Sequence, residues 1–149
     1  MPNRPRRSAP RARRPAAQRS IILDADGLSK LARRDRVVRE MIRQEIELAG
    51  SRLVVPMIVV TQAFVDTSNE EEIRAILRGA NEVPAGSIDT AILAARLIVA
   101  TQKLDVVDAT VAAEALRRVP AIVITSDPDD LRALLEADER GAGVELWTV

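Results

Sequence analysis

The stretch IILDADGLSK, residues 21–30, decides how this chain is interpreted, because a short apolar run ends directly in an acidic turn. The run at 21–23 has the composition of a buried strand; Asp24 follows it at once, and Asp26 comes one residue later. In open α/β sheets, ligands bind beyond the carboxyl ends of the strands. Asp24 is therefore a candidate site residue, although it can also serve only as the cap of the next helix.

Beyond this stretch, apolar segments suited to buried strands alternate with segments of helical pattern and capping residues. This alternation predicts an α/β fold with a mainly parallel central sheet and helices on both faces, an α/β/α sandwich. The strands are expected at 21–24, 52–55, 81–83, 121–125 and 144–149. The helices are expected at 28–49, with a break near 33–35 and Gly50 as C-cap, and at 57–65 and 69–77. Further helices are expected from Ser87 or Asp89 to 101, and at 105–118 and 127–137.

The 149 residues include neither Cys nor His, and this excludes several classes of chemistry. Disulfides, thiolate metal sites, histidine general bases and ordinary zinc sites are ruled out. Any reaction must use carboxylates, hydroxyls, Lys or Arg, and a bound metal is expected to be a hard cation such as Mg²⁺ or Mn²⁺. The length suits one domain, and no apolar run approaches the roughly 20 residues that span a bilayer.

The formal net charge of zero hides an asymmetry between the N-terminus and the rest of the chain. Residues 1–20 contain seven Arg and no acid, which leaves 15 of the 22 basic residues against all 22 acidic ones in 21–149. This composition predicts a disordered tail at 1–20 and one domain at 21–149. The tail is an arm that holds RNA phosphates, a solvated extension, or the product of a misplaced translation start. No apolar segment precedes Ile21, so we expect no secretory signal.

Acidic residues follow two of the expected strands and begin one of the expected helices. Asp127 comes two residues after Thr125, the end of a strongly apolar strand, much as Asp24 ends its own strand. Asp105 and Asp108 are three residues apart, so they share one face of a helix. If the two strands are neighbours, these carboxylates converge, and a divalent cation makes such a cluster of like charges tolerable. The pattern therefore favours an acidic metal site at the carboxyl edge of the sheet.

Each of these acids also has a purely structural explanation. Asp127 precedes Pro128, and this pair is a good helix start whatever the function. Asp105 can be only the N-cap of its helix. Capping and metal binding are compatible, so both roles stay open.

The opening LDADG resembles the first motif of haloacid-dehalogenase-like phosphatases, in which the first Asp is the nucleophile and the second is the general acid. This resemblance implies hydrolysis of phosphate monoesters with Asp24 as nucleophile and Asp26 as acid. The family usually has Thr or Ser after the Gly, where this chain has Leu28.

Nearly all of 21–149 more closely resembles a PIN domain of the VapC-like toxin type, found in bacterial toxin–antitoxin pairs. Three segments occur in the order and spacing of that family: ILDADGLSKL at 22–31, DVVDATVAAEAL at 105–116 and VITSDPDDLRAL at 123–134. Between them, VVPMIVVTQAFVD at 54–66 is similar to the family's valine-proline followed by a helix. Position by position, the resemblance implies that the catalytic and metal-binding acids are Asp24, Asp108 and Asp127, with Thr125 as the hydroxyl beside the last.

Gln62 is where this chain departs from the family, because most relatives have a Glu there. An amide can coordinate a cation through oxygen but brings no charge. Asp105 is the best substitute because it lies one helical turn from Asp108, and Asp26 and Asp66 are the other candidates. A PIN fold with weak or absent activity, acting only as a binding module, is therefore an alternative function.

The function that the resemblance implies is a metal-dependent endoribonuclease with Mg²⁺ or Mn²⁺ as cofactor and RNA as substrate. It also implies a cytoplasmic protein that forms a homodimer and binds a cognate antitoxin protein. The cations that follow the first site turn are expected to guide RNA phosphates, or else to form a solvated helix face. They are Arg33, Arg34 and Arg36.

Overall fold

The computed structural model describes residues 18–66 and 69–149, and within them it contains one four-stranded sheet. All strand pairs are parallel, in the order β2-β1-β3-β4. The prediction of a parallel α/β sheet is confirmed. The strands are β1 (Ser20–Leu23), β2 (Arg52–Val54), β3 (Ala121–Thr125) and β4 (Val144–Thr148).

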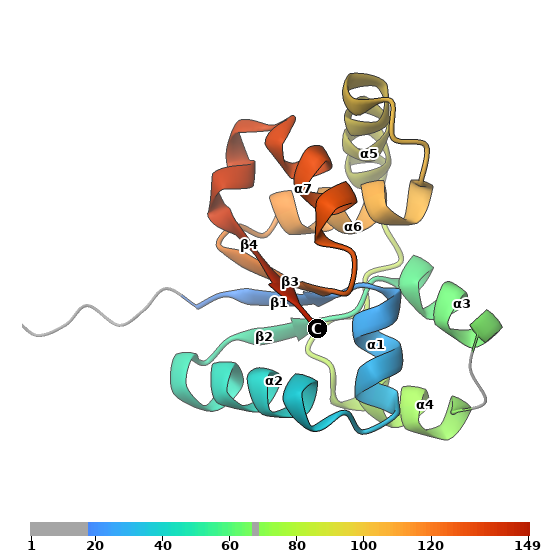
Figure 1. The fold of residues 1–149 in the computed structure, drawn as a ribbon, viewed down its shortest axis with the longest axis vertical. Coiled ribbons are helices and arrows are strands. Elements are labelled where there is room, and N and C mark those ends of the chain that lie inside the picture. Colours follow the sequence, from blue (N-terminus) through green and yellow to red (C-terminus); the bar gives the residue numbers. More distant parts are fainter. Residues whose placement is uncertain (1–17, 67–68) are drawn as a thin grey trace, which may run out of the picture.

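The helices form layers on both sides of this sheet (Figure 1). In that view α5, α6 and α7 lie above the sheet, whereas α1, α2 and α4 lie below it and α3 stands beside its carboxyl edge. Helices on both faces are what a parallel sheet requires, because its crossover connections run over the faces. The helices are α1 (Ala25–Ala32), α2 (Arg36–Ala49), α3 (Met57–Asp66), α4 (Glu70–Gly79), α5 (Ile88–Thr101), α6 (Val106–Leu116) and α7 (Pro128–Glu136), with a short 3₁₀ helix at Glu139–Gly143.

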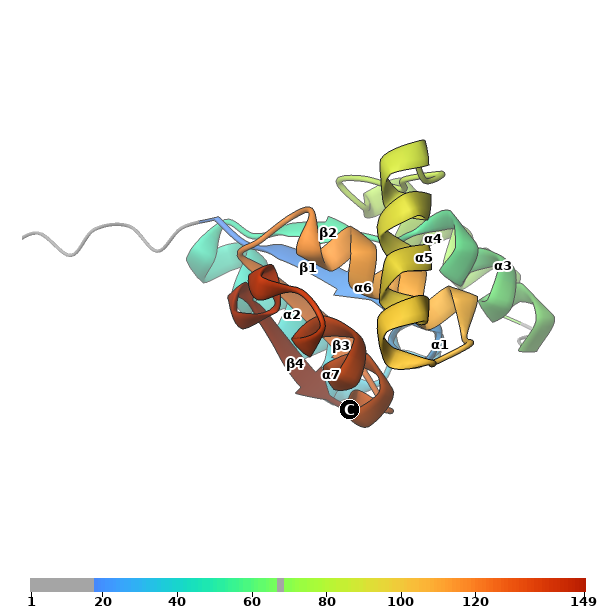
Figure 2. The same ribbon diagram turned by 90° about the horizontal axis from the view of Figure 1, so that it is seen from above.

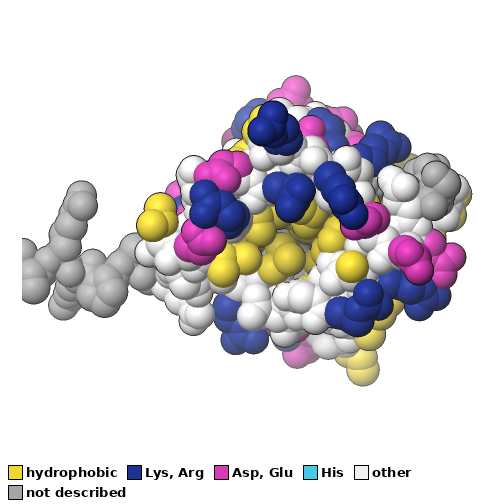
Figure 3. Space-filling model, turned by 90° about the horizontal axis from the view of Figure 1, so that it is seen from below, with side chains coloured by type: hydrophobic (Ala, Val, Ile, Leu, Met, Phe, Trp, Pro, Cys, Tyr) yellow, Lys and Arg dark blue, Asp and Glu magenta, His cyan; other side chains and the backbone are white. Residues whose placement is uncertain are grey.

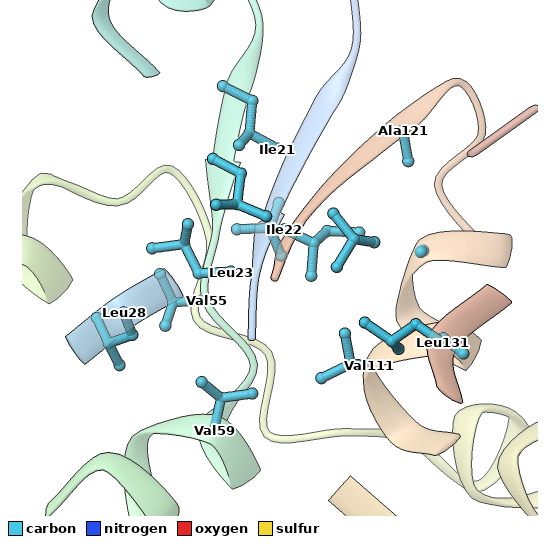
Figure 4. Packing of buried hydrophobic residues seen from close by; sticks show 14 of the residues in the cluster. Ile21, Ile22, Leu23, Leu28, Val55, Val59, Val111, Ala121 and Leu131 are labelled. Carbon is cyan, nitrogen blue, oxygen red and sulfur yellow. The ribbon is translucent and has the colours of Figure 1, made fainter. Parts of the chain in front are cut away.

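The core lies on both faces of the two central strands. Every residue of β3 is buried, as are the last three of β1. Figure 4 shows Leu28 and Val59 on one side of β1 and Val111 and Leu131 on the other. Near-continuous apolar strands such as AIVIT are therefore explained by burial on two sides.

The predicted break near 33–35 separates α1 from α2. Arg34 adopts a left-handed backbone with φ 63°, which a helix interior does not allow. Asp35 then begins α2, because its carboxylate accepts hydrogen bonds from the backbone N–H groups of Val37 and Val38. Gly50 ends α2 in the left-handed conformation that its lack of a side chain permits.

The predicted strand at 81–83 is wrong. This segment forms an isolated parallel bridge with β2, Val54 with Glu82, and no ladder: backbone N–H groups of Asn81 and Glu82 donate to the Leu53 carbonyl, and Val55 donates to the Glu82 carbonyl. Asn81 uses its side chain to accept a hydrogen bond from the backbone N–H of Leu53 at 2.7 Å. Pro84 has no N–H to donate to a ladder, so the pairing does not extend into a strand.

The described part of the chain includes Gln18, Arg19 and Ser20, three residues that the sequence pattern placed with the basic tail. Ser20 begins β1, and Arg19 forms ion pairs at 2.8 Å with Glu45 of α2 and with Glu145 of β4. Its guanidinium also lies 5.8 Å from the ring centre of Trp147. Residues 1–17, the rest of the predicted tail, lie outside the described residues.

The face that lies beneath the sheet in Figure 1 is seen directly in Figure 3, where hydrophobic side chains line a hollow and Lys and Arg side chains stand around it. Among the described residues, no helix combines the length and the hydrophobicity that crossing a bilayer requires.

The chain reverses direction across the sheet between β1 and β3. From β1 it moves outward to β2, and it then returns to place β3 on the other side of β1. The carboxyl ends of β1 and β3 therefore form the topological switch point, where ligands bind in sheets of this kind.

Candidate acidic site at the carboxyl edge of the sheet

A cavity of about 290 Å³ lies at this switch point, and we call it the acidic cavity. Its acids come from separate elements: Asp24 and Asp26 at the start of α1, Asp105 and Asp108 at the start of α6, and Asp127 after β3. Residues far apart in the chain are thus brought to one place by the sheet order. The lining also includes Ala25, Ser29, Lys30, Arg33, Gln62 and Thr125.

Asp24 is buried and held from two sides. Its carboxylate accepts a hydrogen bond of 2.6 Å from the backbone N–H of Gly27, so it does cap α1. Burial raises the pKa of Asp24, and hydrogen bonds from the Thr125 hydroxyl and the Gly27 N–H partly oppose that rise. Asp24 is therefore both the cap of α1 and a residue of the acidic cavity, and these hydrogen bonds fix the orientation of its carboxylate.

Gly27 allows this arrangement because it has no side chain. A Cβ at this position would stand 2.7 Å from the carbonyl oxygen of Ile124 and 3.2 Å from the Asp24 carboxylate. The Gly of the LDADG motif thus lets the first turn of α1 approach the end of β3 closely.

Asp127 differs from Asp24, because its carboxylate does not cap the helix that follows. Its backbone N–H instead donates to the Thr125 hydroxyl oxygen at 3.0 Å. Thr125 is buried between the two acids. Its hydroxyl donates a hydrogen bond to the Asp24 carboxylate and accepts one from the backbone N–H of Asp127, so it orients both. Asp127 does stand at the N-cap position before Pro128, as the helix-start explanation predicts, but its carboxylate makes no capping hydrogen bond within the described residues.

The sequence left helix capping and metal binding open for Asp105 and Asp108, and the structure gives the capping role to Asp105 alone. Asp105 is the N-cap of α6 and accepts from the N–H groups of Val107 and Asp108 at 2.8 and 3.0 Å. Asp108 has no side-chain hydrogen bond within the described part of the chain. Burial is the largest cause that raises the pKa of Asp108 to about 6, followed by repulsion from the carboxylates of Asp105 and Asp24.

The donor set suits a hard cation, since it consists of carboxylate, amide and hydroxyl oxygens. The raised pKa values of Asp24 and Asp108 reflect burial and crowding of like charge, which a cation would offset. Across residues 18–66 and 69–149, no three acidic side chains are arranged closely enough to hold a metal ion in this conformation. The chemistry of the residues therefore fits a metal, while their positions do not form a closed ligand cage.

Gln62 of α3 lines the acidic cavity, exposed and without a side-chain hydrogen bond to the described residues. It thus lies where an amide oxygen can reach a ligand of the acids. Asp66 is the last residue of α3, and its side chain lies outside the described part of the structure.

The cations after the first site turn are divided among three environments. Arg33 lines the acidic cavity, whereas Arg34 forms an ion pair of 2.6 Å with Glu72 on α4. Arg36 lines a separate hollow beside α2. Lys30, which the sequence analysis did not single out, lines the acidic cavity one turn before Arg33. The three-residue spacing on one helix face was the signal that could have identified it.

Asp26 is exposed and accepts a hydrogen bond from the Ser126 hydroxyl. This contact joins the two acidic turns, the one after β1 and the one after β3. Asp26 therefore lines the acidic cavity and also holds the two turns at its edge together through this hydrogen bond.

Comparison with known proteins gives a match in fold alone. No family model and no curated protein matches the chain in sequence. Among solved structures, the chain is similar to one chain of the crystal structure of VapBC2 from Rickettsia felis bound to a DNA fragment from their promoter. The TM-score is 0.63 at 9% identity, over 87% of this chain and 98% of that one. This chain has a VapC-like PIN fold.

The PIN fold accounts for the order of the three segments on which the resemblance was based. They correspond to β1 with α1, to the start of α6, and to β3 with α7. Each contributes an acid to the acidic cavity. The predicted fold and its resemblance to the VapC-like type are confirmed.

Proposed function

We propose that this protein is a metal-dependent endoribonuclease of the VapC-like toxin type, which hydrolyses RNA phosphodiesters in the acidic cavity. The observation that supports this most directly is the meeting of Asp24, Asp108 and Asp127 with the buried Thr125 at the switch point of a PIN-like sheet. Oxygen ligands gathered from three elements at that edge suit chemistry on a phosphate.

Asp24, Asp108 and Asp127 would hold Mg²⁺ or Mn²⁺, with Asp105 as the nearest further acid. When bound, such a cation lowers the pKa of a coordinated water and offsets the charge of the attacked phosphate. Asp24 is held in place for this role by the Gly27 N–H and the Thr125 hydroxyl. Asp108 must lose its proton before it can coordinate, and its pKa of about 6 allows this near neutral pH.

Lys30 and Arg33 would contact the phosphates on either side of the scissile bond. Both line the acidic cavity, and neither forms an ion pair within residues 18–66 and 69–149. Cations without an ion-pair partner attract RNA phosphates, whereas the neighbouring carboxylates repel them. Lys30 and Arg33 therefore give the RNA backbone a place to bind beside the acid cluster. Arg34 is a weaker candidate because its guanidinium already pairs with Glu72. Arg36 lies at the separate hollow beside α2.

The same proposal includes a cognate antitoxin protein that silences the site, a homodimeric assembly and a cytoplasmic location. The fold similarity to a chain of VapBC2, which was crystallised with promoter DNA, supports the antitoxin partner.

A second candidate function is a PIN-fold binding module with little or no catalysis. Gln62 favours it, because this exposed amide stands in the acidic cavity where most relatives have a carboxylate. If the missing charge limits metal affinity, Gln62→Glu should tighten binding of Mn²⁺, as measured by calorimetry. A Gln62→Glu variant that is no better than wild type in metal binding or cleavage would count against this explanation.

The test is cleavage of a structured RNA pool with Mg²⁺ or Mn²⁺ against EDTA, comparing wild type with Asp108→Asn and mapping the cut ends. Asp129→Asn is the matched control, because Asp129 is an exposed acid of α7 that pairs with Arg132 outside the acidic cavity. We expect metal-dependent cuts that disappear in Asp108→Asn and persist in Asp129→Asn.

Cuts that persist in EDTA or in Asp108→Asn would refute the proposed mechanism. A folded protein, free of antitoxin, that binds RNA without cutting it would support the binding module. Turnover of a small phosphate monoester in place of RNA would support a phosphatase that uses Asp24.

A further inference from the structure

The lower layer carries a row of cations that begins at the acidic cavity and continues away from it. Lys30, Arg33, Arg36 and Arg39 occupy every third position, the first two at the end of α1 and the last two at the start of α2. The two helices contact each other, and Figure 2, seen from above, shows α2 on the far side of β1 and β3. Lys30 and Arg33 line the acidic cavity, whereas Arg36 and Arg39 do not.

Arg36 and Arg39 belong to a separate hollow of about 400 Å³ beside α2, which we call the α2 hollow. Leu31 is one of its apolar residues, and it lies between Lys30 and Arg33 in the sequence, so the end of α1 lines both hollows. The volume is within the range of sites that hold small ligands. The residues that line the α2 hollow are Leu31, Arg36, Arg39, Glu40, Ile42 and Arg43.

The three arginines of the α2 hollow differ in their ion pairs. Arg43 pairs with Glu40 at 2.7 Å and with Glu47 at 2.5 Å, so nearby acids compensate its charge. Arg36 and Arg39 are exposed, and neither forms an ion pair with any residue that the structure describes. Two uncompensated cations beside an apolar surface favour a ligand that has both anionic groups and an apolar part. A polynucleotide has both, in its phosphates and in the faces of its bases.

We propose that the α2 hollow is a second RNA-binding site, which holds the substrate strand a few nucleotides away from the phosphate in the acidic cavity. Phosphates of that strand pair with Arg36 and Arg39, and a base lies against Leu31 and Ile42. The row of cations favours RNA over an acidic protein segment, because it leads from the α2 hollow to the cavity where a phosphate is to be cut. The inference rests on the proposed function, since that function makes the acidic cavity the place of cleavage.

The α2 hollow makes the contribution of the RNA depend on its length and direction. The row of cations leaves the acidic cavity along the end of α1, so the substrate gains affinity by extending to one particular side of the cut. An RNA too short to reach from the acidic cavity to the α2 hollow gains nothing from Arg36 and Arg39.

The first test is the affinity of the full chain for single-stranded RNA of about 4 and about 16 nucleotides, measured by fluorescence anisotropy. Asp108→Asn is the background, so that the RNA is not cut. Adding Arg36→Ala and Arg39→Ala together should weaken binding of the long RNA about tenfold and leave the short RNA unaffected. The slope of log Kd against log salt should also fall by about 1.4, which is the loss of two phosphate contacts to a single strand.

Arg96→Ala is the matched control for either arginine. Arg96 is an exposed cation of α5, above the sheet in Figure 1, and it has no ion pair among the described residues. Its removal changes the net charge as Arg36→Ala does, so it should leave both affinities unchanged if the position of the charge matters. An equal loss of affinity in Arg96→Ala and Arg36→Ala would overturn the proposal, because it would reduce the effect to net charge.

A second test locates the strand. The RNA carries a photoreactive thiouridine at successive positions on each side of the mapped cut, and the crosslinked peptides are identified by mass spectrometry. We expect crosslinks to residues 31–43 from one side of the cut alone. Crosslinks to this segment from both sides, or from neither, would overturn the proposal.

The outcomes separate this inference from the proposed nuclease. If cleavage is intact while R36A/R39A binds long RNA as wild type does, the α2 hollow is refuted and the nuclease stands. If binding depends on the two arginines in a protein that never cuts, the nuclease fails and the α2 hollow remains an RNA site. If the double variant loses binding of a Glu-rich amphipathic peptide but not of RNA, the α2 hollow belongs to an acidic protein partner and the proposal is overturned.

Discussion

At the scale of single residues, Asp108 connects stability to the proposed chemistry. Burial and neighbouring carboxylates raise its pKa from 3.8 to about 6, so the folded state favours the protonated form. The stability that this proton provides is fully present below the unfolded pKa and is lost as pH rises through about 6. In EDTA, Asp108→Asn should therefore raise the free energy of unfolding at about pH 8 by roughly 1–3 kcal/mol.

The same pair of proteins should differ little at about pH 4, where the wild-type carboxyl is already protonated in the folded state. Urea melts at both pH values measure the difference. A gain that is equal at the two values would mean that it comes from packing and not from charge.

Gly27 is the second residue whose identity the structure explains. Gly27→Ala would put a methyl group against the backbone carbonyl of Ile124, which cannot move without disturbing β3. We expect a loss of about 1–3 kcal/mol in the free energy of unfolding, measured by denaturant melts. Gly79→Ala is the control, because nothing lies within 4 Å of a Cβ there and a helix end accepts Ala readily. Equal effects at the two glycines would contradict the close approach of α1 to β3.

The sequence singled out the acids that line the acidic cavity but not the hydrogen bonds that each of them makes. Asp24 and Asp105 cap helices as well as line the cavity, whereas Asp127, preceding Pro128, looked like the best cap and its carboxylate is not one. Which oxygen accepts a given N–H depends on backbone angles that composition does not reveal. Lys30 was missed because the rotation of α1 about its axis is set by tertiary packing.

At the scale of elements, α1 should contribute to substrate affinity through its cavity-lining face. Lys30→Ala and Arg33→Ala should each raise the KM for RNA about tenfold, a loss of roughly 1.4 kcal/mol, with kcat nearly unchanged. Arg34→Ala should alter KM far less, because that side chain points to Glu72. Steady-state kinetics at several salt concentrations measure this. A larger rise in KM for Arg34→Ala than for Arg33→Ala would contradict this prediction, because it would place the phosphate contacts on the side of α1 that faces away from the acidic cavity.

Most elements were predictable because local pattern and tertiary fold agree. The N-cap Asp105 and the helix end at Gly50 were visible in the chain, and Ser87 is the one of two candidate N-caps that the structure selects. The segment 81–83 was not, since its apolar Val83 suggested a strand while the neighbouring Pro84 prevented one. Long-range hydrogen bonds decide such short segments.

At the scale of the whole molecule, Arg19 joins the two ends of the chain's folded part. Its guanidinium bridges Glu45 of α2 and Glu145 of β4 and lies over Trp147. Among the described residues, Arg19→Ala leaves the nearly buried Glu45 carboxylate with the Ser51 hydroxyl as its one remaining partner. The free energy of unfolding should fall by about 1–2 kcal/mol, as measured by urea melts. Arg34→Ala, which breaks a solvent-exposed pair, should leave stability unchanged. If Arg19→Ala and Arg34→Ala lowered the free energy of unfolding equally, the ion pairs of Arg19 would contribute no more than an exposed surface pair.

The position of β1 in the middle of the sheet has a consequence for synthesis on the ribosome. Among the described strands β1 is translated first, yet one of its two neighbours is β3. The hydrogen bond between Asp26 and Ser126 closes across 100 residues. The acid cluster therefore cannot assemble on a nascent chain until the second acidic turn, 100 residues after the first, has been translated. Order of synthesis thus keeps the growing polypeptide without the complete acid cluster up to that point.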